Sequence, residues 1–176
     1  MWALFAGDYL KGEFTPKNPN KCLNKNGKLP NSKDKITFRS SYEMIFANWC
    51  DLEDDVIEWG SEVIEIQYFS KVDNKKHRYI TDFVFMSRNA DGGVDKWLVE
   101  IKPKSQVPVL NAVGEIQFPE LPKKKRVTKK SIERWQSFCN VLKTNHEKWE
   151  SARVWARKNG YNFKVITEQE LGLVVG

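Results

Sequence analysis

Two runs of β-branched and aromatic residues, separated by a turn-forming segment, most constrain what this chain can fold into. Residues 78–86 and 97–102 are rich in the Val, Ile, Phe, Tyr and Trp side chains that favour β-strands. Between them, Asn-Ala-Asp-Gly-Gly at 89–93 has the composition of a tight turn. The pattern therefore predicts an antiparallel β-hairpin whose turn is centred near Asp91.

The register of this hairpin brings charged side chains together. A turn centred on Asp91 places Asp82 opposite Glu100, and opposed residues on antiparallel strands point to the same face. Lys102 follows Glu100 by two positions and projects from that face as well. Two adjacent carboxylates on apolar strands are unfavourable unless a cation or proton compensates them. We expect a divalent-metal site in which Lys102 orients a water or stabilises negative charge; the alternative is an exposed strand face with solvated charges.

A helix after residue 40 supplies a further carboxylate. Ser40-Ser41-Tyr42-Glu43 matches the Ser-x-x-Glu capping box, in which Ser40 and Glu43 form reciprocal hydrogen bonds. Apolar residues then recur at helical spacing over about ten residues, namely Tyr42, Ile45, Phe46 and Trp49. Glu43 lies at the edge of this apolar face. It can cap the helix or reach a metal on a neighbouring sheet, and the two roles compete for the same oxygens.

The rest of the chain predicts one domain over residues 36–176, preceded by an irregular, Gly- and Pro-containing arm over 1–35. Strands are expected at 56–59, 62–68 and 161–166, with a polar turn at 71–77 and an irregular loop at 106–121. An acidic connector is expected at 51–55. A long helix is expected from a cap at Ser131 to about Lys158, with Gly160 ending it.

Charge points to a polyanionic partner. The chain has 29 Lys and Arg against 23 Asp and Glu, a net charge of +6. The segment 122–130 concentrates basic residues; such a run can be a solvated loop, a nuclear-import signal or a set of phosphate contacts. We expect phosphate contacts from the exposed basic side chains, namely Arg39, Lys104, Lys123, Lys124, Lys125, Arg126, Lys129 and Lys130.

Several protein classes are disfavoured. The three cysteines are widely spaced and odd in number, which argues against a disulfide framework and fits a reducing compartment. No apolar run approaches the roughly 18 residues that a membrane span needs. The first residues lack the basic flank of a signal peptide. We expect a soluble, intracellular protein without a membrane partner.

The order of these features resembles the PD-(D/E)xK nuclease superfamily: a helix with Glu43, strands, Asp82, the run Glu100-Ile101-Lys102, a long helix and a strand. Thr81 stands where the motif name has proline, a position that is tolerant in such families. The resemblance implies an α/β fold with a restriction-endonuclease-like core, a mixed sheet flanked by helices. It also implies Mg²⁺ (or Mn²⁺) as cofactor and a set of catalytic residues, Glu43, Asp82, Glu100 and Lys102. The implied metal ligands are Asp82, Glu100, the Ile101 carbonyl and Glu43.

A closer resemblance extends over most of the chain. The segments 12–19, 38–43, 49–51 and 100–105 are similar to those of head completion nucleases of T4-like tailed phages, and the core is similar to the N-terminal endonuclease domain of the Tn7 transposition system. The resemblance implies an enzyme that processes the ends of packaged double-stranded DNA. Portal, neck or packaging proteins would be its partners, in the host cytoplasm during assembly or in the virion.

Two other functions stay open at this point. One is a non-catalytic, DNA-binding head-completion or neck protein that retains a nuclease fold. The other is a transposase-type endonuclease subunit that acts within a larger complex. The intact set of four candidate residues, Glu43, Asp82, Glu100 and Lys102, favours an enzyme over the non-catalytic protein.

Overall fold

A computed structural model of the chain describes residues 11–23, 35–121 and 127–173. Its main sheet, within these residues, has five strands in the order β2-β4-β7-β8-β9. These strands are β2 (Cys22–Leu23), β4 (Val56–Ser61), β7 (Phe83–Arg88), β8 (Val94–Ile101) and β9 (Asn162–Ile166). The pairs β4–β7 and β7–β8 are antiparallel, whereas β2–β4 and β8–β9 are parallel. The expected mixed sheet flanked by helices is confirmed.

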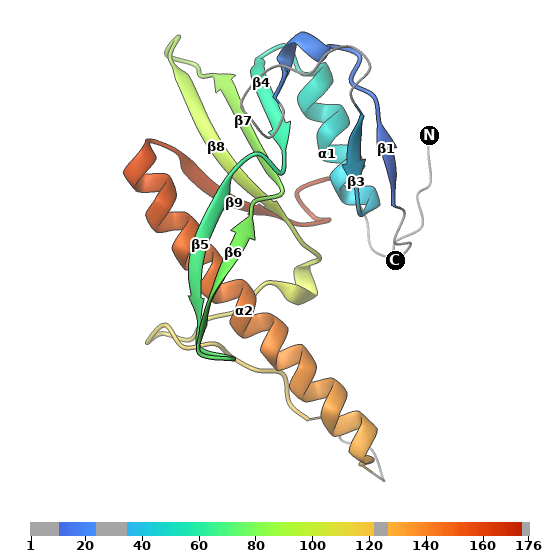
Figure 1. Cartoon of the computed structure of the whole chain (residues 1–176), viewed down its shortest axis with the longest axis vertical. Helices are drawn as coiled ribbons and strands as arrows, with labels where there is room; N and C mark the ends of the chain where they lie inside the picture. Colours follow the sequence, from blue (N-terminus) through green and yellow to red (C-terminus); the bar gives the residue numbers. More distant parts are fainter. Residues whose placement is uncertain (1–10, 24–34, 122–126, 174–176) are drawn as a thin grey trace.

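Two short sheets lie beside the main one. The strands β1 (Gly12–Phe14) and β3 (Ile36–Phe38) pair antiparallel next to the first helix. The strands β5 (Glu65–Ser70) and β6 (Lys75–Ile80) form an antiparallel hairpin beyond the main sheet (Figure 1). Two 3₁₀ turns complete the structure, η1 (Pro19–Lys21) and η2 (Lys104–Gln106).

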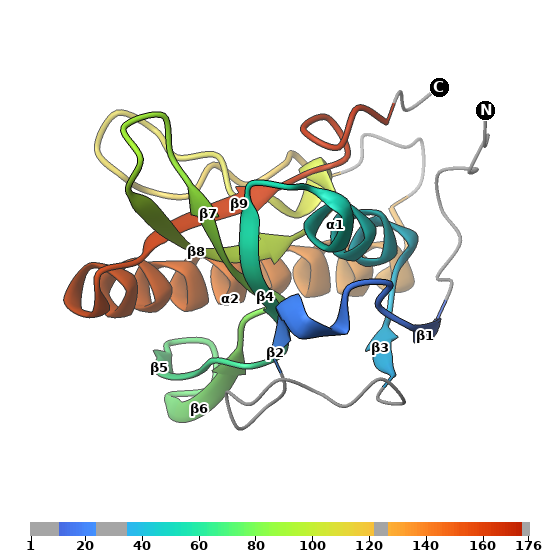
Figure 2. The same ribbon diagram turned by 90° about the horizontal axis from the view of Figure 1, so that it is seen from above.

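The two α-helices of the described residues pack on opposite faces of the main sheet (Figures 1 and 2). Helix α1 (Ser41–Leu52) packs against Phe83 and Phe85, and the Phe46 and Phe83 ring centroids are 5.0 Å apart. Helix α2 (Lys129–Asn159) packs against the intervening Val84 and against Leu98. Because neighbouring strand residues point to opposite faces, β7 needs apolar side chains at every buried position.

The long helix differs in its start from the sequence-based prediction. Thr128 is the N-cap, and Ser131 is the third helical residue, whose backbone N–H and hydroxyl bond to Thr128. The helix ends at Gly160, as expected, because this residue adopts the left-handed conformation with φ of 74°. Its N-terminal part extends beyond the sheet (Figure 1). No helix in the described ranges is both long enough and apolar enough to cross a membrane.

The predicted hairpin register is confirmed. Phe83 pairs with Val99 and Val84 with Leu98, so one further step along the same register places Asp82 opposite Glu100. The prediction of a continuous strand over 78–86 is wrong, however. The backbone bends at Thr81 and Asp82, which separate β6 from β7 and hence the small hairpin from the main sheet.

Backbone hydrogen bonds explain this bend. The Thr81 N–H donates to the Ile64 carbonyl, whereas the Asp82 carbonyl accepts from the Glu62 N–H, so both residues pair with the segment 62–64 but the register shifts by one residue between them. A proline at position 81 could not make the first of these bonds, because it has no N–H. The position named for proline in the PD-(D/E)xK motif is therefore used here as a backbone donor.

Strands β1 and β2 lie in the segment 1–35, which was expected to be irregular. Hydrogen bonds to Asp51 hold part of this segment in place. Asp51 was expected in a connector but lies in α1, where it is fully buried. Its carboxylate accepts hydrogen bonds from the backbone N–H of Lys17 at 2.7 Å and of Asn18 at 3.1 Å. These bonds hold the chain that leads through η1 into β2, which then pairs with β4.

The substitution Asp51→Ala should lower the free energy of unfolding by about 3 kcal/mol, because it leaves backbone N–H groups without their charged acceptor. Urea unfolding followed by circular dichroism measures this loss. Asp54→Ala, at an exposed position just after the helix, is the matched control and should change stability by less than about 0.5 kcal/mol. Equal losses in the two variants would contradict the role assigned to Asp51.

Candidate active site

An open pocket of about 380 Å³ lies where the start of α1 meets one end of the main sheet. Because β7 and β8 are antiparallel, the start of β7 and the end of β8 lie at the same edge of the sheet. Three of the four predicted catalytic residues line this pocket, Glu43, Asp82 and Lys102, and Glu100 contacts Lys102 from a buried position. The structure thus brings the predicted residues to one place from three separate segments of the chain.

Asp82 lies at the bend that begins β7. Its Oδ2 accepts a hydrogen bond of 2.8 Å from the Ile101 N–H and lies 3.4 Å from the Lys102 Nζ. Burial and the nearby charge of Glu100 raise the pKa of the Asp82 carboxyl to about 7, against the opposing effects of Lys102 and the Ile101 N–H. The site therefore carries more negative charge than its own cation and hydrogen bonds compensate.

Glu100 is only 2% exposed, and each of its carboxylate oxygens has its own partner. Oε1 lies 2.9 Å from the Lys102 Nζ, and Oε2 accepts a hydrogen bond of 2.6 Å from the Tyr79 hydroxyl. Tyr79 comes from β6, outside the main sheet, and burial followed by the Glu100 charge raises its pKa, so the hydroxyl stays a donor. Sequence reasoning did not identify Tyr79 as part of the site.

The Lys102 ammonium group contacts all three groups that were expected to hold a metal on the hairpin. Besides the Asp82 and Glu100 carboxylates, Nζ donates to the Ile101 carbonyl at 3.1 Å. Burial by itself lowers the pKa of Lys102, but the two carboxylates outweigh this effect and raise it. The oxygens are thus arranged around a positive charge, and an all-oxygen set of this kind suits a hard cation such as Mg²⁺ or Mn²⁺.

Glu43 lines the same pocket but uses its oxygens for the helix cap. Its Oε2 accepts from the Arg39 N–H at 2.8 Å and its Oε1 from the Ser40 hydroxyl at 3.1 Å, while its own N–H donates to Ser40. Within the described ranges, no group of three or more His, Cys, Asp and Glu side chains is arranged to hold a metal ion. Of the three predicted carboxylates, Asp82 and Glu100 contact the same Lys102 ammonium group, whereas Glu43 lies beside them at the pocket wall.

The predicted phosphate-binding residues lie in several places. Arg39 lines the pocket and pairs with Glu62. Lys104 is exposed in η2, just after β8. Lys129 and Lys130 are exposed on the first turn of α2, and neither lines the pocket. The remaining four predicted residues, Lys123, Lys124, Lys125 and Arg126, lie outside the described residues.

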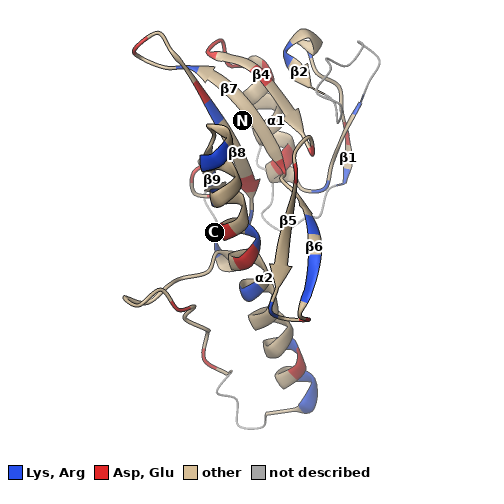
Figure 3. Cartoon of the chain, turned by 60° about the vertical axis from the view of Figure 1, so that its left-hand side comes forward, with Lys and Arg blue, Asp and Glu red and all other residues tan. Residues whose placement is uncertain are grey.

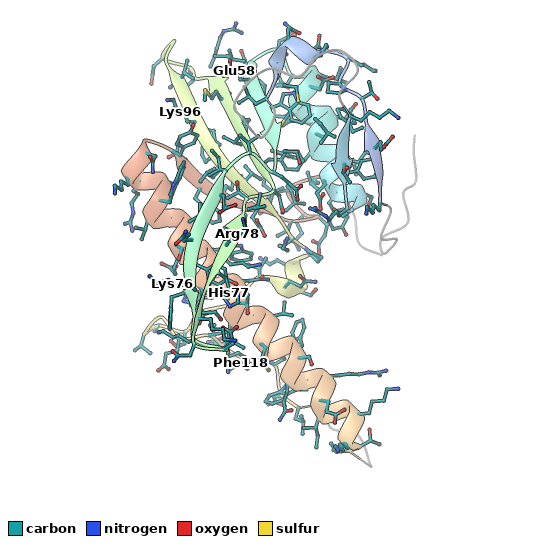
Figure 4. All side chains as sticks on the ribbon, viewed as in Figure 1. Glu58, Lys76, His77, Arg78, Lys96 and Phe118 are labelled. Atoms are coloured by element: carbon teal, nitrogen blue, oxygen red, sulfur yellow. The ribbon has the colours of Figure 1, made fainter. Side chains whose placement is uncertain are left out.

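The structure adds a basic strand that sequence reasoning missed. Lys75, Lys76 and Arg78 are exposed on β6, and Lys76 and Arg78 alternate with the buried Tyr79. Figure 3 shows the basic stretch of β6 in blue, and Figure 4 labels Lys76 and Arg78. The segment up to residue 77 was expected to be a polar turn. The signal available in the sequence was the alternation of charged and aromatic residues at 76–79, which is typical of a strand with one exposed face.

Comparisons with known proteins identify the family of the chain. The family model described as "TnsA-like endonuclease N terminal" matches residues 53–168, a range that includes Asp82, Glu100 and Lys102 but not Glu43. The chain is also 32% identical over 160 residues to the head completion nuclease of Enterobacteria phage T4. That alignment covers 91% of this chain and 92% of the T4 protein. The chain therefore belongs to the family of TnsA-like endonuclease N-terminal domains.

Proposed function

We propose that this protein is a metal-dependent DNA nuclease that hydrolyses phosphodiester bonds at the Asp82–Glu100–Lys102 site. The observation that carries the proposal is the position of the Lys102 ammonium group, held jointly by two carboxylates and a backbone carbonyl beside an open pocket. Membership of an endonuclease family supports the same reading.

The cofactor in this proposal is Mg²⁺ or Mn²⁺. Asp82, Glu100 and the Ile101 carbonyl are its protein ligands, and Glu43 at the pocket wall orients a water or adds a ligand. The bound ion supplies Lewis-acid polarisation of the phosphate and a more acidic water. Burial and the neighbouring Glu100 charge, which together raise the pKa of Asp82, are the physical reason for a cation to bind here.

Lys102 has two positions in this mechanism. In the structure its Nζ contacts the same oxygens that hold the ion, and two cations cannot share that position. Lys102 has a long, flexible side chain, so its ammonium group can turn toward the pocket while Asp82 and Glu100 stay in place. There it donates to the attacking water or to the phosphate oxygens on which negative charge develops.

The substrate in this proposal is double-stranded DNA. Arg39 at the pocket and Lys104 just beyond β8 would hold phosphates near the reacting bond. Lys129 and Lys130 would hold phosphates farther along, on a helical turn that contains no acidic residue and lies at the positive end of the helix dipole. The basic residues of β6 would contribute in the same way.

The biological role in this proposal is the processing of packaged DNA ends during phage head completion, with portal, neck or packaging proteins as partners in the host cytoplasm. The support is the alignment with the T4 protein named head completion nuclease, which extends over nearly the full length of both chains. That coverage favours this role over a subunit of a transposase.

Digestion of plasmid and linear duplex DNA with Mg²⁺ or Mn²⁺ tests the nuclease. Lys102→Ala and Glu100→Gln should each lower the cleavage rate by about 10²-fold or more, because each removes charge that acts on the transition state. EDTA should abolish cleavage. Lys158→Ala, an exposed charge at the far end of α2, is the matched control and should cleave as the parent does. Unchanged cleavage by Lys102→Ala would refute the mechanism.

Removal of the Asp82 charge should change stability in a pH-dependent way. The folded-state pKa of Asp82 is raised from an ordinary value of 3.8 to about 7, so the folded protein binds the extra proton and loses that stabilisation as pH rises through this window. In EDTA, Asp82→Asn should therefore be more stable than the parent at pH 8, by on the order of 2 kcal/mol, and little different near pH 4.

Urea unfolding at pH 4 and pH 8, with and without Mg²⁺, measures this effect. Mg²⁺ should stabilise the parent at pH 8 because it binds the folded protein, and it should not stabilise Asp82→Asn. A stability difference between the two proteins that is the same at both pH values would show that Asp82 does not carry the uncompensated charge.

The phosphate contacts of α2 can be tested through salt dependence. The double variant Lys129→Ala/Lys130→Ala should reduce the slope of log affinity against log salt by about 2, because each lost phosphate contact removes about 0.9. Fluorescence anisotropy of labelled duplex DNA in EDTA gives this slope. The matched control, Arg157→Ala/Lys158→Ala, removes two charges from the last turn of the same helix. Equal slopes for the two double variants would exclude a specific role of the N-terminal pair.

A further inference from the structure

The hydrogen bond between Tyr79 and Glu100 connects two separate parts of the fold. Tyr79 is 3% exposed and lies on β6 of the small hairpin, whereas Glu100 lies on β8 of the main sheet. The 2.6 Å distance between the Tyr79 hydroxyl and Glu100 Oε2 is short, as expected for a donor to an ionised carboxylate. This contact therefore holds the carboxylate group of a candidate metal ligand from outside the sheet.

The two oxygens of Glu100 are held by very different groups. Oε1 contacts the ammonium group of Lys102, whose long side chain can move. Oε2 contacts a tyrosine whose ring is packed in the core beside Ile66 and Val84, with the Lys148 Nζ 5.5 Å from the ring centre. When Lys102 leaves, Oε1 becomes free while Oε2 stays occupied.

We infer that Tyr79 is a positioning residue that limits Glu100 to a single oxygen, Oε1, toward the cation of the active site. The inference rests on the proposed function, since it concerns the same metal ligands. It assigns a role to a residue outside the PD-(D/E)xK motif, and it makes the hairpin β5–β6 a part of the metal site.

The consequence is a preference among cations. Mg²⁺ is small, requires near-octahedral geometry and takes carboxylates through one oxygen, whereas Ca²⁺ accepts carboxylates through both oxygens. A Glu100 held at Oε2 therefore suits Mg²⁺ and disfavours Ca²⁺. Removal of the Tyr79 hydroxyl frees Oε2, so both oxygens become available and the advantage of Mg²⁺ over Ca²⁺ decreases.

Isothermal titration calorimetry of Mg²⁺ and Ca²⁺ on the full chain tests the inference without any cleavage assay. Tyr79→Phe keeps the ring and should bind Mg²⁺ about 10-fold more weakly than the parent, as is typical when a partner of a metal ligand is removed. The ratio of Mg²⁺ to Ca²⁺ affinity should fall by at least the same factor. Tyr68→Phe is the matched control, because Tyr68 is also buried on this hairpin with Lys148 near its ring. It should keep the parental ratio.

A second pair of variants separates positioning from a general loss of structure. In a Glu100→Gln background, Tyr79→Phe should leave the Mg²⁺ to Ca²⁺ ratio unchanged, because the carboxylate that Tyr79 orients is absent. A parental ratio in Tyr79→Phe itself, or an equal change in both backgrounds, would overturn the inference and leave the proposed nuclease intact. A parent protein that binds neither cation would overturn both.

Discussion

The structure depends on how the carboxylates of Asp82 and Glu100 are accommodated side by side at one end of the inner strands of a mostly apolar sheet. Asp82 and Glu100 come together because of the hairpin register, and burial makes their mutual repulsion strong. Lys102 supplies the compensating charge from just beyond the end of β8, two positions after Glu100. Buried carboxylates at this density contribute little to stability in themselves, so their presence here is better explained by chemistry than by folding.

The surrounding fold places these charges beside a packed apolar core. Phe83 and Phe85 face α1, Val84 and Leu98 face α2, and the charged residues lie where the strands β7 and β8 begin and end. Glu43 approaches from α1 but is held by its own helix cap. The pocket thus lies beside a packed apolar core and contains the flexible charged side chain of Lys102, as the proposed replacement of its ammonium group by a metal ion requires.

Much of this site follows from local sequence rules, and what does not follow is informative. The turn at 89–93 and the strand composition were sufficient for the register, and the Ser40–Glu43 pair was sufficient for the cap. Tyr79 was missed because it precedes Asp82 by three positions, so a continuous strand would have pointed the two side chains to opposite faces. Because the chain bends at Thr81, the alternation of faces does not continue from β6 into β7. The bend depends on backbone hydrogen bonds to residues 62 and 64, which no local sequence pattern specifies.

Long-range partners explain the other differences. The burial of Asp51 requires the backbone of residues 17 and 18, and the two residues of β2 form a strand only because β4 is beside them. Such pairings are set by tertiary structure rather than by propensity. The N-cap at Thr128 in place of Ser131 is instead a local difference, since both residues have capping side chains.

The parallel pairing of β8 with β9 has a consequence for the order in which the protein becomes complete. The backbone N–H of Lys102 donates to the carbonyl of Ile166, and that of Lys104 donates to the carboxylate of Glu168. The segment that carries Lys102 thus acquires supports from residues that follow it by about 64 positions in the chain, and such distant pairings form late in folding. A growing chain that already contains Asp82, Glu100 and Lys102 but not yet Ile166 and Glu168 therefore lacks these two supports of the pocket.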